Sequence, residues 1–451
     1  MLSYGMKVAV LGLGVSGRAA VRYARHCGAE VLVSDIRSEQ RLVAEEGAFL
    51  TETKVEWEAG GHRREFLNRA QLLLVSPGVD LGLHLFKALQ EDGVHIVGEF
   101  SVAAGLIKVP VVAITGTNGK TTVTTLIGDI FATAGKRVFV GGNIGTPLYE
   151  YLLHPEAYDI IVAEVSSFQL ETAGNFAPDV GVLLNITPDH LDRHGSMERY
   201  AEAKMQLFVH QPPASVAIIN GDDPLCCKLV PGLPSIVQTF GLGHASTAVV
   251  GEQTITVTID GRQEEYQCAP AEPLNTITLM NYAAAILATR ALACTQTQIM
   301  AGLRAFQPLQ HRIEFVAETR GVRYYNDSKA TNTGAVIGAL AQFSGNVILI
   351  AGGRDKNDDF RLLRTSVAAK VKKLVLIGEA AGLLEEALAD LVPILTAQSM
   401  EEAVRTAAQH GTAGDVVLLS PACASFDMFN SYGHRGSEFK KAVLALGSTR
   451  V

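Results

Sequence analysis

Short apolar strands alternate with helical stretches along this chain of 451 residues, and that alternation constrains its fold more than any other feature. The strands fall into three blocks, residues 1–106, 107–310 and 311–451. Typical strands are KVAVLGLGVSG and EVLVSD in the first block, VVAIT, DIIVAEVSS and SVAIIN in the second, and NVILIAGGRD and DVVLLSPACAS in the third. Strands separated by helices pair in parallel sheets with right-handed crossovers. We therefore predict an α/β protein with three domains in these ranges.

The pattern changes after Gly241, where apolar and polar residues begin to alternate. The segment TITVTIDGRQEEYQC predicts a hairpin turned at Asp260 and Gly261, and an alanine-rich helix, NYAAAILATRALA, follows it. An antiparallel hairpin within a block of otherwise parallel strands predicts a mixed sheet. We expect this mixed sheet in the central domain, between Rossmann-like N-terminal and C-terminal domains.

Composition excludes several classes of protein. The formal net charge of -8 argues against general binding to nucleic acid or anionic membranes. The six cysteines form no C-x-x-C pair, so we expect free thiols in a reducing cytoplasm. The N-terminal segment MLSYGMKVAVLGLGVSG is rich in glycine, which indicates a first strand rather than a signal peptide. No apolar run approaches the roughly 20 residues of a membrane span. We therefore expect a cytoplasmic protein without one.

A glycine-rich turn follows the first strand. Gly12 to Gly17 match G-x-G-x-x-G, and Asp35 ends the next predicted strand. Glycines allow the backbone to approach a pyrophosphate at a helix N-terminus. The motif fits a dinucleotide such as NAD(P), but another nucleotide diphosphate or a purely structural turn fits it too.

A second glycine turn, TGTNGKTT at residues 115–122, lies between the strand VVAIT and a helix. It is a shortened phosphate-binding loop, because the full pattern requires a glycine where Ile114 stands. The backbone N–H groups would cup phosphates, Lys120 would reach the β and γ oxygens, and Thr121 could bind Mg²⁺. An ordinary glycine turn is the structural alternative.

Glu164 ends the buried strand DIIVAE, where a carboxylate is costly unless it is paired or bound to a metal. Mg²⁺ bound to ATP would use such a group directly or through water. A salt bridge or a helix cap is the alternative explanation.

Lys204 occupies an unusual position in the segment NITPDHLDRHGSMERYAEAKMQLF. A helix that starts near Ser196 places apolar residues on one face, with Lys204 in the middle of that face. Burial disfavours a charged ammonium, so the side chain either extends to the rim or is a neutral amine. A neutral amine can capture CO₂, and the resulting carbamate is a hard ligand for Mg²⁺. His190, on the preceding loop, would be its companion.

Together these stretches resemble the Mur ligase family, the ATP-dependent amide-forming ligases of peptidoglycan synthesis. The resemblance extends over essentially the whole chain, through HRIEFV, YNDSKATN, GGRDKNDDF and SPACASFDMFNSYGHRGSEF. The last four are most similar to the members that add D-glutamate to UDP-N-acetylmuramoyl-L-alanine, since other members usually have D-Y-A-H-x-P where this chain has NDSKATN. In this family the N-terminal glycine loop holds UDP rather than NAD, and the central domain is a phosphate-loop ATPase.

The resemblance implies a role for each matching position. The residues implied to contact the UDP-linked substrate are Val15, Ser16, Asp35, Arg37, Ser76, Gly78 and Asn143. Those implied to bind ATP are Gly116, Thr117, Asn118, Gly119, Lys120, Thr121, Thr122, Asn281, Arg312 and Asp327. Those implied to bind the amino acid are Lys329, Thr331, Lys356, Ser425 and Tyr432. Thr121 and Glu164 would hold one magnesium, and His190 with carbamylated Lys204 a second. The residues that we expect to act in catalysis are Lys120, Glu164, His190 and Lys204. We expect the protein to be a monomer.

The sequence departs from the family at the alanine-rich helix. Relatives commonly have H-N-x-x-N there, whereas Met280 and Ala284 replace the histidine and the second asparagine, leaving Asn281. Three other functions stay open: an NAD(P)-dependent oxidoreductase with an accessory phosphate loop, a ligase similar to folylpolyglutamate synthase, and a non-catalytic nucleotide-binding regulator. The second would not be expected to carry an N-terminal UDP-type domain. The third gives no reason for Lys204 and His190 to occur together.

Overall fold

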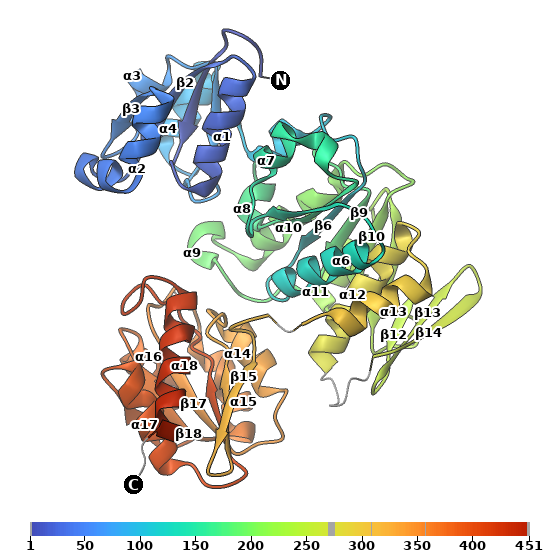
Figure 1. Ribbon diagram of the computed structural model, residues 1–451, viewed down its shortest axis with the longest axis vertical. Coiled ribbons are helices and arrows are strands. Elements are labelled where there is room, and N and C mark those ends of the chain that lie inside the picture. The colour runs from blue at the N-terminus through green and yellow to red at the C-terminus, as the bar shows by residue number, and fades with distance from the viewer. Residues whose placement is uncertain (1, 269–275, 308, 357, 449–451) are drawn as a thin grey trace. The chain divides into compact units, whose positions relative to one another are not determined.

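A computed structural model of the protein describes residues 2–268, 276–307, 309–356 and 358–448, and it contains three sheets flanked by helices (Figure 1). The chain divides into two compact units. The first contains the N-terminal and central sheets, and the second contains the C-terminal sheet together with Thr187–Met197. The expected α/β fold with three sheet domains is confirmed.

The N-terminal sheet has five parallel strands in the order β3-β2-β1-β4-β5. Val8 and Val10 pack against α1 and α2, whereas Ala9 and Leu11 face α3 and α4. Helices therefore cover both faces, as a parallel sheet requires. The strands are β1 Lys7–Leu11, β2 Glu30–Asp35, β3 Glu56–Ala59, β4 Leu72–Val75 and β5 His95–Val97. The helices are α1 Val15–His26, α2 Glu39–Thr53, α3 Arg64–Leu67, α4 His84–Glu91 and, after the sheet, α5 Glu99–Ala103.

The central sheet has nine strands in the order β14-β13-β12-β11-β10-β9-β6-β8-β7. Neighbours are parallel from β7 to β12, and the last two pairings are antiparallel. Asp260 and Gly261 both have positive φ, 50° and 73°, as a tight hairpin turn requires. The predicted hairpin and mixed sheet are therefore confirmed. The strands are β6 Val111–Thr115, β7 Val138–Gly142, β8 Ile160–Glu164, β9 Val180–Leu183, β10 Val216–Asn220, β11 Ile236–Gly241, β12 Ala248–Val250, β13 Thr254–Ile259 and β14 Arg262–Gln267.

Two helices of the central region carry predicted site residues. The phosphate loop opens α6, Lys120–Thr133, and Lys204 lies on α10, Met197–Val209. Gly302 of α13 lies so close to α6 that a Cβ there would be 2.7 Å from the Cα of Ile130. The remaining helices are α7 Leu148–Leu153, η1 Pro155–Ala157, α8 Ser167–Leu170, α9 Leu191–His194 (counted with the second unit), α11 Pro224–Leu229, α12 Thr276–Ala291 and α13 Gln296–Ala305.

The C-terminal sheet has the order β15-β16-β20-β17-β18-β19, parallel except for the β15–β16 pair. Leu349 and Ala351 of β17 face α14, α15 and α16, whereas Ile348 and Ile350 face α17 and α18. This core is again covered on both faces. The strands are β15 Glu314–Thr319, β16 Val322–Asn326, β17 Val347–Gly352, β18 Val371–Ile377, β19 Ile394–Thr396 and β20 Val416–Leu419. The helices are α14 Thr333–Leu340, η2 Phe360–Leu363, α15 Arg364–Lys370, α16 Ala381–Leu388, α17 Met400–His410 and α18 Tyr432–Ser448.

Two other expectations concern the whole chain. All six cysteines are free thiols, as predicted. Within the described ranges, each helix is too short or too polar to cross a membrane.

Candidate active site

The phosphate loop joins the carboxyl end of β6 to the first turn of α6. Gly116 and Gly119 have φ of 148° and 86°, values that side chains rarely adopt. A Cβ at Gly119 would lie 2.8 Å from Oδ1 of Asn281, so the predicted ATP residue on α12 borders the loop. Gly119 caps α6 without a side-chain hydrogen bond. The backbone N–H groups of this turn suit an anion, so the local structure fits a phosphate.

Lys120 folds back over the loop that precedes it. Its Nζ donates to the carbonyl oxygens of Gly116 and Thr117, each at 2.9 Å. These bonds hold the ammonium at the turn, where it can meet phosphate oxygens. Thr122 follows in the first turn of α6 and is half-buried.

Asn185, which follows β9, is hydrogen-bonded to the phosphate loop, and sequence reasoning missed it. Its Oδ1 accepts from the backbone N–H of Asn118 at 2.8 Å, and its Nδ2 donates to the Asn118 carbonyl at 3.0 Å. Its own carbonyl accepts from the N–H of Thr117 at 2.9 Å. The available signal was a polar residue directly after the buried segment VGVLL, at the carboxyl end of a strand beside β6.

Glu164 lies at the end of β8 and is almost fully buried, with both carboxylate oxygens engaged. Thr121 Oγ1 donates to Oε2 at 2.8 Å, and Asn143 Nδ2 donates to Oε1 at 2.7 Å. The structure thus brings together the hydroxyl and carboxylate predicted for one magnesium, with Asn143 beside them. Over the described part of the chain, no three His, Cys, Asp or Glu side chains gather as a metal site. A magnesium here would therefore take its remaining ligands from phosphate and water, which it readily accepts.

Lys204 is buried on α10 with 1% of it exposed, so its side chain does not extend to the rim, which was one of the two alternatives. Its Nζ donates to the Gly116 carbonyl at 2.8 Å and lies 4.4 Å from the ring centroid of Tyr200. The Tyr200 hydroxyl is 3.2 Å from Oγ1 of Thr117. The structure therefore brings Lys204 to the same loop as Lys120. Sequence reasoning missed this polar contact of Tyr200.

His190 and its neighbours belong to the second compact unit, whereas Lys204 belongs to the first. Asp189 Oδ1 is 3.3 Å from Nζ of Lys356, and Asn332 Nδ2 donates to Asp189 Oδ2 at 3.0 Å. Burial would raise the pKa of Asp189, but Lys356 and His190 outweigh it, and the pKa is lowered. The structure thus joins Lys356 to the residue before His190. The joint metal site of His190 and carbamylated Lys204 stays a prediction.

The remaining amino-acid residues follow strands of the C-terminal sheet. Lys329 Nζ lies 3.9 Å from the ring centroid of Tyr432, so an ammonium and an aromatic face meet here. Ser425 is buried in the turn after β20, and Thr331 is half-buried two residues beyond Lys329. These loops lie at carboxyl ends of parallel strands, where α/β proteins usually bind ligands.

Asp327, which follows β16, is a buried carboxyl. Burial raises its pKa to about 7. The Ser420 hydroxyl donates to Oδ2 at 2.8 Å, and this bond, together with the charge of Arg312, offsets only part of that rise in the pKa. The two residues predicted to position ATP from this domain are therefore electrostatically coupled.

The N-terminal residues meet at the carboxyl ends of β1, β2 and β4. Asp35 accepts from the backbone N–H of Leu13 at 2.7 Å and from Nη2 of Arg37 at 2.7 Å. Burial would raise the pKa of Asp35, but these hydrogen bonds lower it to about 2. Ser76 Oγ donates to the Gly12 carbonyl at 3.0 Å. Val15 and Ser16 begin α1, and Gly78 lies just after Ser76. Because β1 lies between β2 and β4, this is the topological switch point of the sheet.

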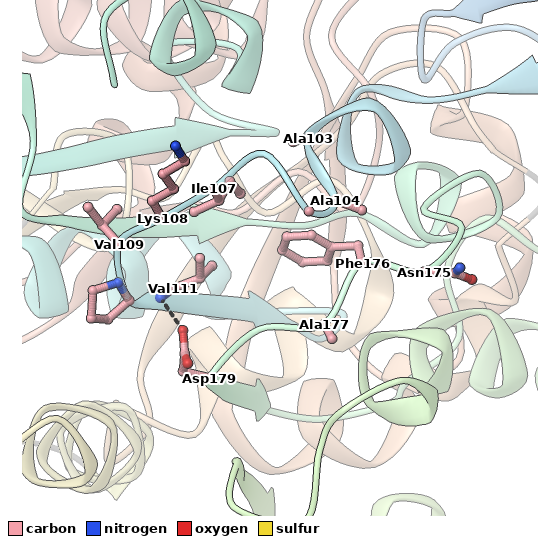
Figure 2. A pocket seen from close by; sticks show the side chains of 12 residues that line it. Ala103, Ala104, Ile107, Lys108, Val109, Val111, Asn175, Phe176, Ala177 and Asp179 are labelled. Carbon is pink, nitrogen blue, oxygen red and sulfur yellow. Dashed lines mark hydrogen bonds between the residues drawn. The ribbon is translucent and has the colours of Figure 1, made fainter. Parts of the chain in front are cut away.

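A separate cavity of about 460 Å³ opens at the other end of β6. Figure 2 shows Lys108, Phe176 and Asp179 at its wall, with Asp179 accepting a hydrogen bond from the backbone N–H of Val111. Val111 starts β6, whereas the phosphate loop follows its last residue. None of the predicted site residues lines this cavity, so we do not assign the reaction to it.

The chain belongs to the Mur ligase family. Residues 6–98 match the Mur ligase MurD-like N-terminal domain, 114–288 the Mur ligase middle domain, and 311–423 the Mur ligase glutamate ligase domain. A UDP-N-acetylmuramoylalanine–D-glutamate ligase of Desulfotalea psychrophila is 51% identical over 438 residues, with 97% of this chain and 96% of that protein covered. A ligase of the same name from Pelotomaculum thermopropionicum is 43% identical, with 98% of each chain covered.

Solved structures share the fold at lower identity. A pseudomurein peptide ligase type C from Methanothermus fervidus has a TM-score of 0.63 at 19% identity, with 98% of this chain and 100% of that chain covered. The MurF ligase of Thermotoga maritima, in complex with ADP, has a TM-score of 0.61 at 19% identity, covering 98% and 96%. At such identities the likeness concerns the fold alone.

Proposed function

We propose that the protein joins D-glutamate to UDP-N-acetylmuramoyl-L-alanine at the expense of ATP, in the synthesis of peptidoglycan precursors. The observation that carries this proposal is the cluster at the phosphate loop, where Lys120, Lys204 and the Thr121–Glu164 pair converge in a chain of this family. We assign the UDP-linked substrate to residues 1–106, ATP to 107–310 and the amino acid to 311–451.

The reaction needs ATP because a carboxylate is a poor acyl donor. A carboxylate oxygen of the alanyl group takes the γ-phosphoryl group, and ADP leaves. The amine of D-glutamate then attacks the acyl phosphate, and phosphate leaves with that oxygen as the amine loses a proton. Negative charge builds in both steps, and Lys120, held at the loop by two carbonyl groups, stabilises it.

Magnesium fits the oxygen atoms that the loop cluster offers. Thr121 with Glu164 would hold one ion there. A second ion, held by His190 and a carbamate on Lys204, is proposed from the family resemblance alone. When bound, Mg²⁺ supplies Lewis-acid stabilisation of phosphoryl oxygens. The chain itself positions the loop through Asn185 and excludes water from Lys204 by burial.

The amino-acid pocket would recognise the two carboxylates of D-glutamate. Lys329 and Lys356 are cations on loops after β16 and β17, and Ser425 and Tyr432 add hydroxyl groups. A desolvated carboxylate needs such partners, whereas an ammonium among them would be repelled. The UDP end would bind at Asp35 and Ser76, with Asn143 near Glu164. We expect a monomer that works in the cytoplasm, where ATP and UDP-linked precursors are available.

An omission experiment tests this function. Phosphate release should require UDP-N-acetylmuramoyl-L-alanine, ATP and D-glutamate together, and the product should have the mass of the amide. Release that continues without D-glutamate or without the UDP-linked substrate would contradict the proposal. The oxidoreductase alternative predicts instead that NADH fluorescence changes on titration with the protein, which the proposed function does not.

A further inference from the structure

A guanidinium is fully buried among the loops that carry the predicted amino-acid residues. Arg435, in the first turn of α18, is 0% exposed. Burial lowers its pKa to about 10, so the group stays charged at neutral pH. A buried charge is costly unless hydrogen bonds compensate for it. The partners of Arg435 therefore indicate what this residue is for.

The partners of Arg435 are backbone and hydroxyl oxygens of two loops. Nε donates to Ser328 Oγ at 3.0 Å, and Nη2 donates to the Ser328 carbonyl at 2.8 Å. Nη1 donates to the carbonyls of Cys423 and Ala424, at 3.0 and 3.3 Å. Ser328 lies in the loop after β16, and Cys423 and Ala424 lie in the loop after β20. The guanidinium thus bridges the loops that follow two neighbouring strands.

Two further segments are hydrogen-bonded to Ser328 and Ala424, which Arg435 binds. Ser328 Oγ donates to the carbonyl of Tyr432, which is the first residue of α18. The carbonyl of Ala424 also accepts from the N–H of Arg354, in the loop after β17 at 2.9 Å. Gly353 permits this approach, because a Cβ there would lie 2.3 Å from the Ala424 oxygen and 3.1 Å from Nη1 of Arg435.

Each segment carries part of the predicted amino-acid pocket. The loop after β16 carries Lys329 and Thr331, the loop after β20 carries Ser425, the loop after β17 carries Lys356, and α18 begins with Tyr432. We propose that Arg435 is a positioning residue for this pocket, which sets the affinity for the amino acid by fixing the loops that bind it. The inference rests on the proposed function, because it takes these loops to be the amino-acid site.

A lysine at this position separates positioning from charge. Arg435→Lys keeps the positive charge, but its single nitrogen cannot take the separate, fixed positions of Nε, Nη1 and Nη2. We expect the KM for D-glutamate to rise by about tenfold or more, a loss of about 1.4 kcal/mol, while the KM for ATP stays within about twofold. Arg364→Lys is the matched control, since Arg364 forms an exposed pair with Asp390, and it should leave both constants unchanged.

A merely structural role would lower the folded fraction, and hence kcat and Tm, without changing either KM. That result, or a D-glutamate KM within about twofold of wild type, would overturn the proposal. Should Arg435→Lys not fold, Ser328→Ala removes one acceptor and the bond to Tyr432 but keeps the guanidinium. A selective rise in the D-glutamate KM is again expected, and no rise would overturn the inference. If the wild-type protein uses another amino acid, the proposed substrate is wrong. The effect of Arg435→Lys on the KM for that amino acid then tests the positioning role separately.

Discussion

At the scale of single residues, two lysines donate to the same carbonyl of the phosphate loop, and substituting each of them tests the site. Lys120 and Lys204 both donate to the Gly116 oxygen. In the proposed function Lys120 stabilises charge on phosphate, and loss of one such group typically costs ~10²-fold or more in kcat. We expect Lys120→Ala to abolish turnover in a folded protein, whereas Lys136→Ala, an exposed lysine just beyond the same helix, retains it. Turnover near normal in Lys120→Ala would remove the phosphate role.

Lys204 offers a chemical test at its amine. Its burial and its place beside the loop favour a neutral amine that captures CO₂. We expect a crystal structure with nucleotide and magnesium to show a planar three-atom group beyond Nζ, and Lys204→Ala to lose activity. Density that ends at Nζ, or full activity in the alanine variant, would contradict carbamylation.

The same two lysines show how far the residues could be predicted. Lys120 was evident from a glycine motif and Lys204 from its place on an apolar helix face, since both signals are local in sequence. The contacts of Asn185 and Arg435 were missed because their partners include backbone oxygens and N–H groups of distant loops. Residue type and spacing carry no record of such partners, so only the fold reveals them.

At the scale of the elements, three short helices contribute groups around one buried carboxyl, that of Glu99, whose charge depends on pH. Glu99 starts α5, and its Oε1 accepts weakly from Leu148 N–H of α7 at 3.5 Å and from Gln169 Nε2 of α8 at 3.4 Å. Its Oε2 has no partner among the residues that the structure describes. Burial raises the pKa of Glu99 to about 7, from an ordinary 4.5. The folded protein therefore binds this proton more tightly than the unfolded chain does.

That shift has a definite sign for stability. Because the pKa of Glu99 is raised in the folded protein, its contribution to the free energy of unfolding is complete below about pH 4.5. This contribution is lost as the pH rises to about 7. Glu99→Gln should remove this part of the pH dependence, a difference on the order of 3 kcal/mol between the two ends of the range. Thermal unfolding of both proteins from pH 5 to 8 measures it. Parallel profiles would show that Glu99 titrates normally.

Element prediction succeeded where the hydrophobic pattern was strong. The segments KVAVL, VVAIT and NVILIAG are buried strands, as expected. The strands β5 and β19, three residues each with no fully buried residue, left too little pattern to detect. The pairing of β15 with β16 was also missed, because β15 is half-exposed and its register shifts between Phe315 and Ala317.

At the level of the whole molecule, the predicted site residues lie in clusters that the chain builds separately. The N-terminal switch point, the phosphate loop and the loops after β16, β17 and β20 each form complete local structures. The order of the three blocks was predictable because each follows the alternation of strand and helix. The inclusion of Thr187–Met197 in the second unit was not, because it depends on contacts such as Asp189 with Lys356.

The most direct test of the central claim is a panel of amino acids in the coupled reaction. With UDP-N-acetylmuramoyl-L-alanine and ATP present, phosphate release would be measured with D-glutamate, L-glutamate, L-alanine and diaminopimelate. A pocket built for a buried side-chain carboxylate rejects analogues that leave its donors unpaired. We predict the highest kcat/KM for D-glutamate, with L-alanine and diaminopimelate near background. Faster phosphate release with L-alanine or diaminopimelate than with D-glutamate would contradict both the pocket and the proposed reaction.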